Sequence, residues 1–321
     1  MVEVGAMTVA TDARVDLVSG LVGLTRWGAE AYGEFDHSVK REVHAALRSC
    51  PATARAVDLL EGAPHFRFDA PYCWALHHAP LPDLLPLGEP PGYCRRAWNH
   101  AHATLDAVTE AMRAVAAHGA TAAALATAAE MQAAPVAQAA EWIWAADPEG
   151  WLDRALGPSP TRPAVVLAAM IDWHGHGATV GPTAYAILGG KGVGPAGLPV
   201  YGSAVDVPAV VLHEIAHARL NPAVESVWPA LPAGVRQALG RAYPSPRGDL
   251  AEAAVQGLTF AYCLDVWGPA ALHDDQSKRP PMVDLLRGAW LDMLPSRPIA
   301  PQVAVAVLAN AVAGGQEGRR T

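Results

Sequence analysis

The sequence predicts a mainly helical α+β protein that contains a small mixed sheet. Three observations lead to this fold class. Long stretches between residues 12 and 151 show helical periodicity or are rich in alanine, which loses no side-chain entropy in a helix. Short apolar runs between residues 164 and 188 have the length of strands. Two long, largely apolar helices are then predicted at 209–222 and 249–267.

Residues 1–157 are expected to form a mainly helical N-terminal region. Residues 2–9 alternate between apolar and polar side chains as a strand does, and Asp12 is then placed to cap a helix. The helical patterns in this region cover residues 12–27, 36–62 and 98–151. The segment 157–163 is rich in proline and is the best boundary in the chain.

Residues 158–313 are expected to form a second region that contains the sheet. Strands are predicted at 164–172, 178–180 and 183–188. The turn residues Gly181 and Pro182 join the last two strands. Beyond residue 267, helices are predicted at 282–293 and 302–313, and residues 314–321 are expected to form a flexible tail.

The predicted helix 209–222 contains His213, Glu214 and His217 at the spacing HExxH. Residues four apart lie on the same face of a helix, so both imidazoles can reach one metal ion, while Glu214 can face a water on that metal. The pattern therefore predicts a Zn2+ site in which His213 and His217 are ligands and Glu214 is the catalytic base.

The ends of this helix are also marked in the sequence. Asp206 is expected to be its N-cap, and Pro208 falls in the first turn, where a missing N–H costs little. Asn221 followed by Pro222 is expected to end the helix. The two histidines would therefore lie on a rigid element of defined length.

A catalytic zinc site usually has three protein ligands and a water, so a third ligand is required. The predicted helix 249–267 is apolar nearly all round except for Glu252, and a buried carboxylate needs a cation or strong donors. We therefore predict that Glu252 is the third ligand. One alternative stays open, because Asp249 as N-cap with Glu252 three residues later is also a capping-box pattern. Asp249 itself and Glu225 are the weaker substitutes as ligand.

An HExxH helix followed by a glutamate on a later helix resembles the gluzincin group of zinc metallopeptidases. The wider chain resembles a family of mostly uncharacterised bacterial proteins known only as a domain of unknown function. This resemblance is carried by residues 11–21, 66–77, 213–222 and 252. It implies a zincin-like fold, with zinc held by His213, His217 and Glu252 and with Glu214 as the acid/base. Thermolysin-like gluzincins have an aspartate four residues after the ligand glutamate, and Gln256 takes that position here.

In the zincin arrangement a small sheet precedes the HExxH helix, and an edge strand lies across the cleft, where it can pair with an extended peptide. Residues 175–178 are the candidate edge. His174 and His176 alternate on one side of it and could polarise a substrate or bind metal, although a polar strand end also explains them. The donor that would stabilise the oxyanion stays unassigned, and the candidates by residue type are Tyr243, Tyr262, His174 and His176.

Composition limits the partners of this chain. Its net charge of −8 and the lack of a basic patch argue against nucleic acid, because phosphate binding needs a positive field. No signal peptide and no apolar stretch long enough for a membrane helix is seen, so we expect no membrane partner and a cytoplasmic location. The four cysteines, Cys50, Cys73, Cys94 and Cys263, form no CxxC pair and are expected to be reduced thiols.

The sequence thus predicts a zinc-dependent hydrolase, most plausibly a metallopeptidase that acts on a peptide or protein substrate. The alternative is a non-catalytic protein that has a structural zinc site and binds a partner through its Ala-rich helices. The presence of Glu214 argues against this alternative, because a purely structural site has no use for a general base. The pattern does not predict an oligomeric state.

Overall fold

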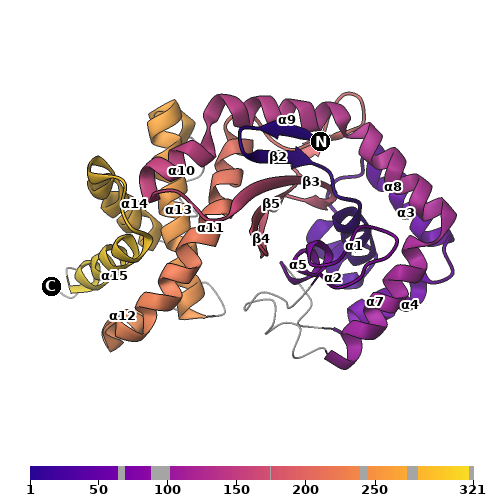
Figure 1. The fold of residues 1–321 in the computed structure, drawn as a ribbon, viewed down its shortest axis with the longest axis horizontal. Helices are drawn as coiled ribbons and strands as arrows, with labels where there is room; N and C mark the ends of the chain where they lie inside the picture. Colours follow the sequence, from indigo (N-terminus) through magenta and orange to yellow (C-terminus); the bar gives the residue numbers. More distant parts are fainter. Residues whose placement is uncertain (64–68, 88–101, 174, 239–244, 273–280, 318–321) are drawn as a thin grey trace. The chain divides into compact units, whose positions relative to one another are not determined.

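The computed structural model describes residues 1–63, 69–87, 102–173, 175–238, 245–272 and 281–317 (Figure 1). The chain divides into two compact units. The first unit consists of Met1–Trp144 and Arg162–Val207, and the second of Ala145–Thr161 and Pro208–Thr321. This division differs from the predicted boundary at residue 157, because the strands that follow the boundary belong to the same unit as the N-terminal helices.

A five-stranded sheet lies in the first unit, with strand order β1-β2-β3-β5-β4 (Figure 1). Its strands are β1 (Val2–Val4), β2 (Met7–Ala10), β3 (Arg162–Asp172), β4 (Gly175–Val180) and β5 (Thr183–Gly190). The central strand β3 is parallel to β2 and β5, whereas β1 pairs antiparallel with β2 and β4 with β5. The loop between β4 and β5 begins with Gly181 at φ +55°, a conformation that tight hairpins require and glycine adopts without strain. Because β4 is the last strand in this order, it lies at an edge of the sheet, as predicted.

Helices in the first unit pack on this sheet and on one another. They are α1 (Ala13–Gly23), α2 (Arg26–Tyr32), α3 (Ser38–Ser49), α4 (Thr53–Glu61), α5 (Ala70–Leu76), α7 (His102–Ala116), α8 (Gly119–Met131) and α9 (Ala133–Ala146), the last of which runs into the second unit. Two short strands, β6 (Gly192–Val193) and β7 (Pro199–Val200), form a separate pair. The core joins the apolar face of α1 to β3, because Leu17, Leu21 and Met170 are all almost fully buried.

The predicted N-cap Asp12 is confirmed, since its Oδ1 accepts the N–H of Arg14 at 2.9 Å. The expectation that all four cysteines are reduced is wrong for Cys73, which is disulfide-bonded, while Cys50 and Cys263 are free. Sequence spacing did not indicate this bond, because a disulfide depends on which cysteines the fold brings within a few ångströms. Cys94 lies outside the described residues.

The described part of the second unit is helical. Its elements are α10 (Pro148–Leu156), α11 (Asp206–Val227), η1 (Trp228–Ala230), α12 (Ala233–Ala238), α13 (Pro246–Trp267), η2 (Pro269–Leu272), α14 (Pro281–Met293), η4 (Leu294–Ser296) and α15 (Pro301–Glu317). The helix α14 packs between α13 and α15 (Figure 1). Because α15 continues to Glu317, the predicted tail from residue 314 begins too early.

The HExxH helix α11 differs from its predicted ends. Its first turn is capped by Ser203, whose Oγ accepts the N–H of Asp206 at 3.1 Å, while Oδ2 of Asp206 accepts the N–H of Ser203 at 3.1 Å. Asp206 is thus the return partner of a capping box instead of the N-cap. Pro222 does not end the helix, which continues to Val227. The next residues, Ala223 and Val224, are buried, and their apolar burial offsets the one backbone bond that proline removes.

The structure therefore confirms a mainly helical α+β protein with a small mixed sheet. The helices that it describes include none of the length and hydrophobicity that crossing a membrane requires.

Candidate metal centre

The helix α11 places both predicted histidine ligands on one face. Nε2 of His213 and Nε2 of His217 lie 3.3 Å apart, as expected for residues one helical turn apart. The carboxylate of Glu214 also belongs to this group, because its nearest oxygen and the ring nitrogens of the two histidines lie within 4.8 Å of one another. Glu214 is buried, so a proton acceptor lies beside the two imidazoles in a site of limited water access.

The third predicted ligand, Glu252, extends from α13 to the same point. Its Oε1 lies 3.3 Å from Nε2 of His213, and its Oε2 lies 3.3 Å from Nε2 of His217. The capping-box alternative for this residue is wrong. The N-cap of α13 is Ser245, whose Oγ accepts the N–H of Gly248 at 3.0 Å, so Asp249 already lies within the helix. Glu252 faces the imidazoles instead of the helix terminus.

These three separations fit one tetrahedral zinc ion. Zinc bonds of 2.0–2.1 Å to nitrogen and oxygen, arranged tetrahedrally, place neighbouring ligand atoms about 3.3–3.4 Å apart. The two Nε2 atoms lie 3.3 Å apart, and each of them lies 3.3 Å from a different oxygen of Glu252. His213, His217 and Glu252 are therefore close enough to share one zinc ion, and three protein ligands would leave a fourth tetrahedral position for water or substrate.

Hydrogen bonds at the far side of each imidazole favour the tautomer that a metal needs. Nδ1 of His217 lies 3.2 Å from Oδ1 of Asn221, an oxygen that can only accept, so Nδ1 carries the proton. Nδ1 of His213 lies 3.4 Å from Oγ1 of Thr259, whose own hydrogen is donated to the carbonyl of Val255 at 2.9 Å. In the neutral form of each imidazole, Nε2 therefore carries the lone pair, and both Nε2 atoms face a carboxylate. This donor set has a strong preference for a cation.

The carboxylate of Glu252 is held from α13 itself. Nε2 of Gln256 donates a hydrogen bond to Oε1 of Glu252 at 2.8 Å, so the residue that replaces the aspartate of thermolysin-like gluzincins supports the glutamate. Burial alone would raise the pKa of Glu252, but its bonds to His213 and His217 outweigh burial and lower that pKa. Burial likewise opposes the charged form of His217, yet the hydrogen bond to Glu252 and the nearby charge of Glu214 raise its pKa to about 9. The centre thus attracts positive charge.

The two weaker substitutes for the third ligand are placed differently. Glu225 is exposed and forms an ion pair with Arg247. Asp249 is buried in the first turn of α13, where its N–H donates to the carbonyl of Ser245 at 3.0 Å. Glu252 is therefore the acid that the fold brings to both imidazoles.

Of the four residues considered as oxyanion donors, Tyr262 is the one described in the same unit as this centre. Tyr262 is fully buried, and its hydroxyl donates to the carbonyl of Ala146 at 3.0 Å. His176 belongs to the first unit, where its Nδ1 lies 2.7 Å from Oδ1 of Asp69. His174 and Tyr243 lie outside the described residues.

Sequence reasoning missed Asn221 and Thr259 as partners of the metal-binding imidazoles. Asn221 had a signal, since it lies four residues after His217 on the same helical face, but it was interpreted as part of a helix end. Thr259 had none, because only the packing of α13 against α11 shows which hydroxyl meets which imidazole.

No known protein-family model matches this chain, and no curated protein or solved structure is significantly similar to it. The gluzincin resemblance therefore stays an expectation from the sequence motifs. The arguments for function come from the geometry of the centre itself.

Proposed function

We propose that this protein is a zinc-dependent hydrolase of the gluzincin type that cleaves peptide bonds. The observation that carries the proposal is the meeting of His213, His217 and Glu252, in which the two Nε2 atoms lie 3.3 Å apart and each lies 3.3 Å from one of the two oxygens of Glu252. Each of these distances is close to the separation of neighbouring ligand atoms in a tetrahedral zinc site, about 3.3–3.4 Å. The peptide substrate follows from the resemblance of the HExxH helix and the later glutamate to gluzincin peptidases.

Each residue of the centre has a distinct role in this proposal. His213, His217 and Glu252 hold the ion, which when bound lowers the pKa of water and polarises a carbonyl group. Glu214 accepts the proton of the attacking water and passes it to the leaving amine. Its buried position beside the imidazoles keeps the carboxylate close to the reacting atoms and limits competition from bulk water.

A structural zinc site is the alternative, and the ligand set favours catalysis. Structural sites use four protein ligands, most often with several cysteines. Within the part of the chain that the structure describes, the group around His213 and His217 contains no cysteine and no third histidine. A carboxylate that is close but belongs to the residue after a ligand, as Glu214 does, suits a base better than a fourth ligand.

The first test measures metal and activity in the parent protein and in Glu214→Gln. The parent should contain about one zinc per chain, and it should hydrolyse members of a peptide library. Glu214→Gln keeps the shape of the side chain but removes the proton acceptor. Zinc content should therefore stay the same, while the hydrolysis rate falls by a factor of about 10²–10⁴.

Glu225→Gln is the matched control, because Glu225 lies on the same helix but is exposed and paired with Arg247. It should change neither zinc content nor rate. A parent protein that neither contains nor takes up zinc contradicts the proposal. A zinc protein whose hydrolysis is equal in parent and Glu214→Gln would move catalysis away from this centre. Zinc binding without any hydrolysis would favour the structural site.

A further inference from the structure

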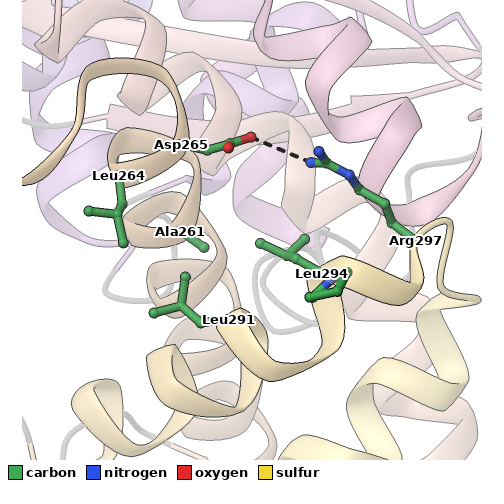
Figure 2. A pocket seen from close by; sticks show the side chains of 7 residues that line it. Ala261, Leu264, Asp265, Leu291, Leu294 and Arg297 are labelled. Atoms are coloured by element: carbon green, nitrogen blue, oxygen red, sulfur yellow. Dashed lines mark hydrogen bonds and ion pairs between the residues drawn. The ribbon is translucent and has the colours of Figure 1, made fainter.

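A second possible ligand site lies in the second unit, away from the metal centre. It is a pocket of about 450 Å³ formed by α13, α14 and η4 (Figure 2). Its lining consists of Ala261, Leu264, Asp265, Leu291, Leu294, Pro295 and Arg297. The pocket thus has five apolar residues and one pair of opposite charges, a composition typical of sites for small ligands with a polar end.

The charged pair stands at one end of the pocket (Figure 2). Nη1 of Arg297 lies 3.4 Å from Oδ2 of Asp265, and the same oxygen accepts the indole N–H of Trp151 at 2.7 Å. Among the described residues, Oδ1 of Asp265 accepts no hydrogen bond, and Nε and Nη2 of Arg297 donate none. One acceptor atom and two donor atoms are therefore available to a ligand on two residues that line the same pocket.

The apolar wall lies next to this pair. Leu264 comes from α13, Leu291 from α14 and Leu294 from η4, and Figure 2 shows these side chains around the same space as Ala261. Leu291 is 37% exposed, which is high for a leucine in a packed helix pair. An apolar side chain placed here would cover exposed surface of the wall and gain hydrophobic free energy.

We propose that this pocket binds a free α-amino acid with an apolar side chain. In such a ligand the ammonium and carboxylate groups lie on one carbon, so both can reach an aspartate and an arginine whose own charged groups lie 3.4 Å apart. The ammonium group donates to Oδ1 of Asp265, and the carboxylate accepts from Nε and Nη2 of Arg297, so that the two charge pairs align head to tail. The ligand side chain then packs against the three leucines.

The pocket is separate from the metal centre on the same helix. Glu252, Gln256 and Thr259 lie on one face of α13, while Ala261, Leu264 and Asp265 lie on the opposite face, because a helix has about 3.6 residues per turn. From Glu252 to Asp265 the helix rises about 20 Å. The inference therefore does not depend on the proposed zinc chemistry.

The test is calorimetric titration of the full-length protein with L-leucine and with analogues that each lack one recognised group. L-Leucine should bind with a dissociation constant of about 1 mM or below. L-Leucinamide lacks the carboxylate, N-acetyl-L-leucine lacks the ammonium group, and glycine lacks the side chain. Each analogue should bind at least about tenfold more weakly, since each loses a charge-assisted hydrogen bond or the apolar contact.

Variants of the charged pair complete the test. Asp265→Asn and Arg297→Gln should each weaken L-leucine binding by about tenfold or more, and Asp265→Asn keeps an acceptor for Trp151. Asp292→Asn and Arg236→Gln are matched controls, because these residues do not line the pocket. Circular dichroism verifies that all four variants are folded. The proposal is overturned if the parent does not bind L-leucine, if the analogues bind equally well, or if the pocket variants bind as the controls do.

Discussion

Two carboxylates, one in each unit, have opposite surroundings, and one of them is fully buried while the other is partly buried. Asp172 at the end of β3 is fully buried, and both of its oxygens lie 2.7 Å from Nζ of Lys40. It also accepts the N–H of Phe35 at 2.9 Å, so its charge is neutralised within the protein. Among the residues that the structure describes, Glu252 on α13 pairs with no lysine or arginine, but with two imidazoles whose Nε2 atoms lie 3.3 Å from its oxygens. The first carboxylate is paired with a lysine, while the second faces two imidazoles that can either hold a proton or, when neutral, bind a metal ion.

A third carboxylate, that of Asp16, shows how burial changes the pKa of an aspartate. Asp16 on α1 is fully buried, and burial, together with the nearby charge of Asp12, raises its pKa to about 7 despite hydrogen bonds from Ala169 and Gln132. Asp16 therefore takes up a proton far more readily than an ordinary aspartate. The pKa of Glu252 moves in the other direction. The difference indicates that the surroundings of Glu252 are suited to a carboxylate that stays charged and binds a cation.

The largest expected effect on stability comes from removing Lys40, the cation that pairs with Asp172. Lys40→Met leaves Asp172 as an uncompensated buried charge, so the free energy of unfolding should fall by about 3–5 kcal/mol. Urea denaturation followed by circular dichroism measures this loss. A second change, Asp172→Asn, in the Lys40→Met background should recover much of it, because the remaining partner is then neutral.

Arg41→Met is the control for this variant. Arg41 is the next residue and forms an ion pair with Asp36 at 3.2 Å, but both side chains are mostly exposed. Its removal should cost less than about 1 kcal/mol. Equal losses of unfolding free energy in Lys40→Met and Arg41→Met would mean that the pair of Lys40 and Asp172 stabilises the fold no more than a surface pair does. Asp172 could then no longer serve as the example of a stabilised buried carboxylate with which Glu252 is compared.

The next largest effect is expected at Glu252. Glu252→Ala removes one of three metal ligands, so zinc affinity should fall by more than the 10–100-fold that loss of a supporting hydrogen bond typically causes. Competition with a chromophoric chelator measures the affinity. Glu225→Ala, which removes an exposed carboxylate from α11, should leave it unchanged.

A weak zinc affinity of Glu252→Ala could come from the missing ligand or from an unfolded protein. Urea unfolding of the metal-free proteins, prepared with a chelator, distinguishes the two causes. Both metal-free forms should unfold cooperatively in urea, and Glu252→Ala should be modestly less stable than the parent, because it loses the pairing of Glu252 with the two imidazoles. If Glu252→Ala binds zinc as tightly as the parent, the third ligand is another residue, and Asp249 would be tested next.

Local patterns predicted much of the fold. The strands β3 and β5 and the helix cap at Asp12 depend on neighbouring residues, and they are confirmed. The division into units was not predicted, because β3 pairs with β2 from the far end of the chain, and no local pattern encodes that partner. The end of α11 was also missed. Proline weakens a helix locally, but the burial of Ala223 and Val224 in the folded unit carries the helix past it.

The candidate centre was predictable to the extent that its residues stand out by spacing or type. His213 and His217 are marked by the HExxH spacing, and Glu252 by being an acid in an apolar helix. Asn221 and Thr259 are common polar residues on helices, so only their contacts with the imidazoles identify them. The local sequence also allowed a capping box that starts at Asp249, but the structure shows that Ser245 is the N-cap of α13.

The smallest of these effects should come from the hydrogen bonds behind the imidazoles. Asn221→Ala removes the acceptor that keeps the proton of His217 on Nδ1, and Thr259→Val does the same for His213 with almost no change in shape. Partners of this kind typically contribute 10–100-fold to metal affinity, so each variant should weaken zinc binding by about that factor in the chelator competition. The contact of Asn221, at 3.2 Å, is shorter than that of Thr259, at 3.4 Å, so Asn221→Ala should have the larger effect.

Thr259→Ser distinguishes positioning from packing, because it restores the hydroxyl without the methyl group. Zinc affinity in Thr259→Ser should return close to that of the parent, whereas a packing role would leave this variant as weak as Thr259→Val. If both Thr259→Val and Asn221→Ala bind zinc like the parent, the two imidazoles keep their metal-binding tautomer without help. The contrast with Asp172, which is paired directly with Lys40, would then be sharper, since zinc binding would depend on the three ligands alone.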